Sequence, residues 1–194
     1  HVVRVGEGLV GEAPRDLPAG ALTVSLHGNA IGPRLGGGLA GLAHLVELNV
    51  SSNALESMAG LAGLVSLRRL NLASNRLARV EGLEELPRLE RLVLRHNWLA
   101  DLGGFCQQPP GGSALREVDL RDNRVASLVE LSALAGLPRL ERLHLGGAAG
   151  GGGNPVCRLG DYRQAVAAAV PRLQELDSEG VSEVAPSGAG LEGG

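Results

Sequence analysis

An eleven-residue pattern, LxxLxLxxNxL, recurs along the chain and constrains its fold more than any other feature of the sequence. Its copies read ALTVSLHGNAI, LVELNVSSNAL, LRRLNLASNRL, LERLVLRHNWL and LREVDLRDNRV, and they begin at Ala21, Leu45, Leu67, Leu89 and Leu115. A sixth copy begins as LERLHL at Leu140. The second and third repeats have 22 residues, the first 24, the fourth 26 and the fifth 25. This near-constant spacing predicts a solenoid, in which each repeat packs on its neighbours.

Within each copy, the apolar residues alternate with polar ones as in a short strand. In LVELNV, we expect Leu45, Leu48 and Val50 to point inward, whereas Glu47 and Asn49 point outward. The remainder of a 22-residue repeat has room for little more than a turn of helix on its return. One repeat cannot bury its own apolar face, so the repeats must fold as a stack.

The asparagine of each copy falls where the chain turns away from the strand. An amide side chain both donates and accepts, so it can satisfy backbone groups that the turn leaves unpaired. Repetition of this residue predicts a ladder of asparagines, which comprises Asn29, Asn53, Asn75, Asn97 and Asn123.

Two insertions interrupt the spacing of the repeats. CQQPPGGS, residues 106–113, lengthens the fourth repeat on its convex side, and GGAAGGGG, residues 146–153, lengthens the last repeat just after its strand. The glycine run predicts a flexible loop. It lacks the lysine and hydroxyl residue of a Walker loop, so it does not indicate a phosphate-binding site.

The ends of the solenoid need caps, because an uncovered end exposes the core. We assign residues 1–20 to an N-terminal cap that begins with an edge strand, residues 21–153 to the repeats and residues 154–177 to a C-terminal cap. The small and polar residues 178–194 predict a disordered linker.

The C-terminal cap has a helical pattern in its middle, from Gly160 to Val170, which Pro171 ends. One face of this helix is expected to cover the last repeat, and its residues are Leu159, Tyr162, Val166 and Val170. Leu173 and Leu176 are expected to add a final turn of repeat-like packing.

Composition narrows the classes of protein that fit. Apolar residues make up 44% of the chain but aromatic residues only 2%, so the core must be aliphatic. A net charge of −3 argues against a nucleic-acid partner, and no apolar stretch is long enough to cross a membrane. The 18 basic residues are all arginine, which we interpret as compositional bias. Two cysteines without a cluster and the lack of a signal peptide favour an intracellular protein, and the start at His1 indicates part of a longer chain.

These repeats resemble the 22-residue leucine-rich repeats of the subfamily typified by a phosphatase-regulating protein. The ending NPVCRLGDYRQAVAAAVPRLQELD resembles the C-terminal cap of that subfamily, with landmarks at Asn154, Tyr162 and Asp177 among others. The resemblance implies an α/β solenoid, a horseshoe of about six repeats with a parallel concave sheet and caps at both ends. A spliceosomal subunit and axonemal dynein light chains share the cap, so it identifies a class of proteins.

The stretch from Gly8 to Asp177 also resembles the N-terminal domain of centrosomal leucine-rich-repeat and coiled-coil-domain proteins. The pieces that carry this resemblance are SLHGNAI, VEGLEEL, LREVDLRDNRV and NPVCRL. It implies a cytoskeletal protein of the centriole or basal body, with a long coiled coil after the repeats and a role in centriole asymmetry and ciliary assembly. The glycine run departs from the acidic insert of that family. The alternatives are a regulatory subunit of a phosphatase or of axonemal dynein, and a subunit of an RNA-processing particle.

Nothing in the sequence indicates catalysis. The five histidines are spread along the chain, and neither HExxH nor CxxC occurs. The hydroxyls of Ser51 and Ser52 precede the asparagine of their repeat, where turn chemistry explains them. We therefore expect no enzyme activity, no metal and no cofactor.

The outward strand positions predict where a protein partner binds, because solenoids usually bind on their concave face. The register also turns outward the residues just after the strands, including Ser51 and Ala73. The candidate partner-binding residues are Arg69, Arg91, Val93, Arg95, Trp98, Asp119, Arg121, Arg142 and His144. Two interpretations remain open: the arginine heads converge on an acidic segment of a partner, or they form ion pairs between strands, such as Arg91 with Glu117.

Overall fold

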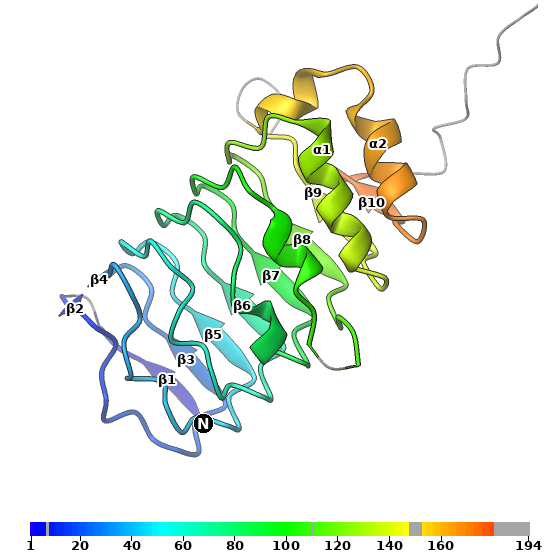
Figure 1. The fold of residues 1–194 in the computed structure, drawn as a ribbon. Coiled ribbons are helices and arrows are strands. Elements are labelled where there is room, and N and C mark those ends of the chain that lie inside the picture. The colour runs from blue at the N-terminus through cyan, green and yellow to red at the C-terminus, as the bar shows by residue number, and fades with distance from the viewer. Residues whose placement is uncertain (7, 110, 148–152, 181–194) are drawn as a thin grey trace, which may run out of the picture.

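The structure, a computed structural model, describes residues 1–6, 8–109, 111–147 and 153–180. One nine-stranded sheet runs along the molecule in chain order (Figure 1). Its strands are β1 (Val2–Arg4), β3 (Thr23–Ser25), β5 (Glu47–Asn49), β6 (Arg69–Asn71), β7 (Arg91–Val93), β8 (Glu117–Asp119), β9 (Arg142–His144), β10 (Glu175–Leu176) and β11 (Glu179–Gly180). Neighbouring strands are parallel except for β10 and β11. The predicted solenoid with a parallel sheet is confirmed.

The strand register follows the repeat pattern residue by residue. The central residues pair across the sheet and are at most 1% exposed, and they are Val24, Leu48, Leu70, Leu92, Val118 and Leu143. The residues on either side of them point to the concave face, because successive side chains of a strand point to opposite faces. Each of these six strands is only three residues long before the chain turns away.

Short helical segments form the convex side, opposite the sheet (Figure 1). They are η1 (Leu83–Glu85), η2 (Gly103–Cys106), α1 (Leu128–Leu131), η3 (Ser132–Gly136), η4 (Pro155–Arg158) and α2 (Tyr162–Ala169). A two-stranded pair, β2 (Val10–Gly11) and β4 (Ala30–Ile31), lies near the N-terminal end. Turns alone form the convex side of the second repeat, as the short repeat length requires.

The convex segments of neighbouring repeats approach one another closely at two glycines. A Cβ atom on Gly104 would lie 1.9 Å from the carbonyl oxygen of Val80, and one on Gly136 would lie 2.3 Å from that of Phe105. Both contacts are with backbone atoms, so these positions accept only glycine at this spacing. Phe105 is fully buried in the core and lies directly before the insertion of the fourth repeat.

The insertions are described only in part. Cys106 ends η2 and Ser113 is buried, so the first insertion is anchored at both of its ends. Residue 110 and residues 148–152 lie outside the described residues, and the expected flexibility of the glycine run falls largely on the latter.

The repeat asparagines bond to backbone groups of two successive repeats. The Oδ1 atom of Asn75 accepts from the Leu55 backbone N–H at 3.0 Å, and its Nδ2 atom donates to the Val50 and Leu72 carbonyls. Asn154 makes the same set of bonds, to Val125, Leu120 and Leu145, and is 1% exposed. It thus occupies the ladder position of the sixth repeat, which the glycine run separates from its strand.

The helix of the C-terminal cap, α2, is shorter than predicted. It begins at Tyr162 and ends at Ala169, whereas the sequence pattern predicted a helix from Gly160 to Val170. Val166 and Val170 are buried, and Tyr162 is half-buried. The prediction for Leu159 was wrong: it is 43% exposed, since it precedes the helix in extended backbone and does not share the helical face.

The last described residues continue the sheet. Leu173 and Leu176 are 7% and 1% exposed, and β10 pairs with β9 in parallel. Residues 178–180, which the sequence assigns to the linker, form a turn and β11 against β10. Residues 181–194 lie outside the described residues.

Candidate protein-binding face

The concave face presents two columns of side chains that flank the buried centres of the strands. The first contains Thr23, Glu47, Arg69, Arg91, Glu117 and Arg142, and the second contains Ser25, Asn49, Asn71, Val93, Asp119 and His144. A third column, beyond the strands, was expected to point outward. Ser51 and Ala73 of that column are instead 6% and 4% exposed, because the chain already turns away from the sheet there.

Glu117 lies at the centre of an ion-pair cluster in the first column. Its Oε1 atom is 3.0 Å from Arg91 Nε, and its Oε2 atom is 3.1 Å from Arg142 Nη2. The Glu117 side chain is 14% exposed, whereas about half of each arginine is exposed. One carboxylate therefore faces two guanidinium groups, and the cluster keeps an excess positive charge.

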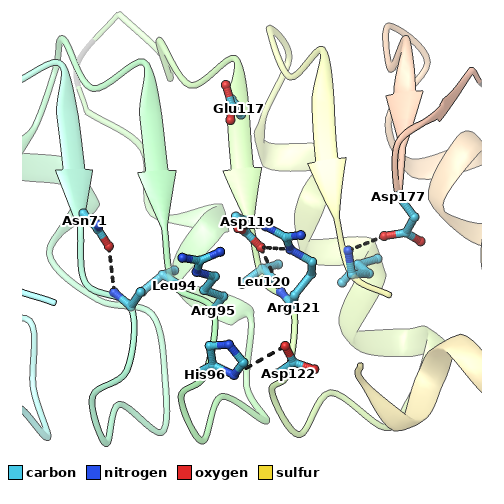
Figure 2. A network of polar contacts seen from close by, with 12 residues as sticks. Asn71, Leu94, Arg95, His96, Glu117, Asp119, Leu120, Arg121, Asp122 and Asp177 are labelled. Atoms are coloured by element: carbon cyan, nitrogen blue, oxygen red, sulfur yellow. Dashed lines mark hydrogen bonds and ion pairs between the residues drawn. The ribbon is translucent and has the colours of Figure 1, made fainter. Parts of the chain in front are cut away.

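Asp119 is buried in the second column and is held by Arg121 (Figure 2). Arg121 donates from Nε to Oδ1 at 2.9 Å and from Nη2 to Oδ2 at 2.7 Å. Burial by itself raises the pKa of Asp119, but the hydrogen bonds and charge of Arg121, together with nearby His144, bring it below its usual value. The carboxylate of Asp119 stays ionised, and it bonds to Arg121 of its own repeat.

A second polar ladder, which the sequence pattern did not reveal, ends three of the strands. The Oδ1 atoms of Asn49, Asn71 and Asp119 each accept from the backbone N–H two residues further on, at 3.0 to 3.2 Å. Asx turns of this kind stop a strand by offering its backbone a side-chain acceptor. Asn or Asp at the last strand position was the signal that could have predicted them.

Arg95, unlike Arg121, has no carboxylate partner among the described residues. It follows β7, whose last residue is Val93, and its side chain is exposed. Among the described residues it forms no ion pair, and Figure 2 draws it beside the Asp119 and Arg121 pair without a contact. Its guanidinium group is therefore available on the concave face.

Arg69 and Arg91 are each turned to a carboxylate, whereas Arg95 is not. Arg69 Nη1 lies 3.9 Å from Glu47 on β5, whereas Arg91 bonds to Glu117 on β8. A hollow of about 190 Å³ remains between them, with Val93 in its lining. The ion-pair interpretation thus accounts for two of these three arginines in the unbound chain.

Trp98 lies at the rim of the face, directly after Asn97 of the ladder. It is 45% exposed, and the Cζ atom of Arg124 in the next repeat lies 5.0 Å from the centre of its ring. A guanidinium group at this distance is attracted by the ring face. Nearby, His96 Nδ1 lies 3.4 Å from Asp122 Oδ2 (Figure 2).

The far end of the face is closed by a cluster around Asp177. Its Oδ1 atom accepts from the backbone N–H groups of Leu145 and Gly146, both at 2.6 Å, and its Oδ2 atom accepts from the Tyr162 hydroxyl at 3.1 Å. Burial is the largest cause that raises the pKa of Tyr162, and Asp177 raises it further. These bonds give Tyr162 a structural position in the cap.

The described residues offer little reactive chemistry. No group of three histidine, cysteine or acidic side chains among them is placed to hold a metal ion. Burial, followed by the charge of Asp177, raises the pKa of Cys157 to about 11, so its thiol is protonated at neutral pH. None of the described helices is both long and apolar enough to cross a membrane.

The comparisons agree with this geometry. A family model described as "Leucine Rich repeats (2 copies)" matches residues 65–107. The chain folds as a leucine-rich-repeat solenoid. An internalin (inlF) structure from Listeria monocytogenes superposes on this solenoid with a TM-score of 0.53 at 19% identity, over 81% of this chain and 47% of that one.

A curated relative of this leucine-rich-repeat chain is cilia- and flagella-associated protein 410 of Homo sapiens. The two are 44% identical over 81 residues, which is 41% of this chain and 29% of the relative. The chain therefore spans less than a third of the length of that protein.

Proposed function

We propose that this solenoid is a non-catalytic protein-binding scaffold domain of a centriole or basal-body protein that acts in centriole asymmetry and in the assembly of cilia or flagella. Leucine-rich-repeat folds generally serve as protein-interaction domains. The ciliary relative supports the cellular setting, since its likeness extends over 81 residues at 44% identity.

The observation that carries the binding proposal is the unmatched positive charge of the concave face. Arg95 has no ion partner among the described residues, and Glu117 is shared by Arg91 and Arg142. An acidic segment of a partner would bond to Arg95 and compete with Glu117 for the two other arginines. Val93 and the hollow beside it would receive an apolar side chain of the same segment.

The other predicted residues would contribute around this centre. Arg69 has only a loose ion pair, at 3.9 Å from Glu47, so it can turn toward a ligand. Trp98, with Arg124 over its ring, would add a contact at the rim. Asp119 and Arg121 bond to each other, and with His144 they would form the floor on which the segment lies.

Reversing the charge of Arg95 tests this proposal. The Arg95→Glu variant should lose the proteins that the wild-type domain captures from an extract of ciliated cells, as measured by quantitative mass spectrometry. Its melting temperature should stay unchanged, because exposed substitutions alter stability by only about 0.5 kcal/mol. Capture by the wild type should also weaken as salt rises.

Arg88→Glu is the matched control, since Arg88 is an exposed arginine directly before the repeat of Arg95 and lies outside the face. It makes the same change of net charge and should retain the captured proteins. Full capture by a well-folded Arg95→Glu variant would contradict the acidic-segment proposal.

A further inference from the structure

A second basic site lies away from the concave columns, at the edge where β8, β9 and β10 begin. There a hollow of about 480 Å³ is lined by Arg116, Arg139, Glu141, Arg172 and Gln174. Three guanidinium groups thus surround it with a single carboxylate, in a chain whose net charge is −3. No residue of this hollow belongs to the proposed partner-binding face.

Two identical turns hold the outer arginines in place. The Leu140 N–H donates to the Leu137 carbonyl at 3.1 Å, and the Leu173 N–H donates to the Val170 carbonyl at 3.1 Å. Each turn has proline at its second position and arginine at its third, and proline favours such turns because its φ angle is fixed. Arg139 therefore occupies the same place in its repeat as Arg172 in the next.

The backbone ladder sets the distance between these groups. Gln174 N donates to the Glu141 carbonyl at 2.8 Å, and Glu141 N donates to the Arg116 carbonyl at 2.9 Å. Neighbouring strands are about 4.8 Å apart, so the long arginine side chains that precede these strands can reach the same hollow. The fourth repeat ends in the small Ala114 at the position that Arg139 occupies in the fifth, so no third arginine of this kind stands beside the hollow.

The charges in the hollow are not balanced. Arg116 forms an ion pair with Glu141, the one carboxylate present. Arg139 and Arg172 are exposed and form no ion pair within the described part of the chain. Two guanidinium groups are therefore free to bind a ligand, and a third is held beside them.

We propose that this hollow binds the phosphorylated serine or threonine side chain of a protein partner. A phosphate monoester carries a charge of about −1.5 to −2 at neutral pH and presents three acceptor oxygens. Its oxygens can accept hydrogen bonds from the guanidinium groups of Arg139 and Arg172 together. A single carboxylate has enough charge and enough oxygens for only one guanidinium group. The site is separate from the concave face, so either proposal can fail without the other.

The test measures the binding of the whole chain to a fluorescein-labelled peptide that has one phosphoserine among glycine and glutamate residues. Fluorescence anisotropy should show tighter binding, by about tenfold or more, than to the same peptide without phosphate. The Arg139→Gln/Arg172→Gln variant should lose this difference. Arg88→Gln is the matched control, because Leu86, Pro87, Arg88 and Leu89 form the same turn outside the hollow, and it should bind like the wild type.

Two further measurements separate this site from a surface of merely structural arginines. Glu141→Gln removes the competing carboxylate and should tighten phosphopeptide binding, whereas Glu90→Gln, at the equivalent position beside Arg68, should not. Binding should weaken between about pH 7.5 and 5.5, as the phosphate loses its second charge near pH 6. Equal affinity for the two peptides, or unchanged binding by the double variant, overturns the proposal.

Discussion

Amide side chains connect each repeat of the solenoid to the next. Six asparagines, from Asn29 to Asn154, each accept a backbone N–H at 3.0 Å, which comes from the N-terminal cap for Asn29 and from the preceding repeat for the other five. Their own amide groups donate to carbonyls that the turning chain has withdrawn from the sheet. A backbone group left unpaired in this interior would lose its hydrogen bond without gaining water, which makes these residues costly to replace.

Replacement of a central ladder residue should therefore destabilise the whole domain. We expect Asn75→Ala to lower the free energy of unfolding by about 1–3 kcal/mol, as measured by urea denaturation, because it leaves the buried N–H of Leu55 unpaired and removes one of the two amide donors to the Leu72 carbonyl. Asn29→Ala should cost less, since Asn29 lies in the first repeat and is partly exposed. A wild-type midpoint for Asn75→Ala would contradict this account of the ladder.

The two ends of the solenoid are covered by different elements. β1 pairs with β3 at one end, and at the other β10 pairs with β9 while α2 packs beside α1. The C-terminal elements bury Val166, Val170, Leu173 and Leu176. Each such aliphatic side chain contributes about 1.5–3 kcal/mol when it is fully removed from water. The cap therefore removes from water an apolar surface that the last repeat would otherwise expose.

Removal of the cap should expose the last repeat and cause aggregation. A chain that ends at Leu159 keeps Asn154 in its ladder position but lacks α2 and β10, so it isolates the contribution of the cap. We expect it to form large species in size-exclusion chromatography, whereas a chain that ends at Gly180 should stay monodisperse and melt like the wild type. A soluble Leu159 truncation with a cooperative melt would show that the cap is dispensable.

The molecule as a whole is a short rod with its arginines spread over separate surfaces. Arg95 on the concave face, and Arg139 and Arg172 at the strand-edge hollow, are guanidinium groups that pair with no carboxylate of the described residues. Two such surfaces on one rigid stack suit a scaffold that brings proteins together. The chain covers 29% of the length of its ciliary relative.

The location of the full-length protein tests that setting. Tagged protein in ciliated cells should concentrate at centrioles or basal bodies, because we expect a coiled coil after the repeats to provide reach and this domain to select partners. The Arg88→Glu variant should show the same location as the wild type, and it controls for the effect of reversing one surface charge outside the proposed face. Protein found only in the nucleus, or spread through the cytosol, would argue against the proposal and favour a role in RNA processing.

The sequence by itself determined the repeat fold, because alternation of leucines and polar residues over a few positions decides which side chains face the core. Leu48, Leu70 and Leu92 pair in the register that the pattern predicts. Only the tertiary structure decided that Arg95 meets no carboxylate among the described residues, whereas Arg69 turns to Glu47 and Arg91 to Glu117. Each of these two paired arginines has a carboxylate opposite it on one neighbouring strand and the other arginine opposite it on the other.

The same limit applies to sites made by distant segments. Nothing in the local pattern placed Asn154 in the ladder, because the glycine run separates it from its strand, and nothing joined Arg116 to Arg172 in one hollow. Leu159 has the apolar character of a core residue, yet it lies outside the helix and remains exposed. Spacing along the chain fixes the repeat, but the stacking of one repeat on the next decides where its charges meet.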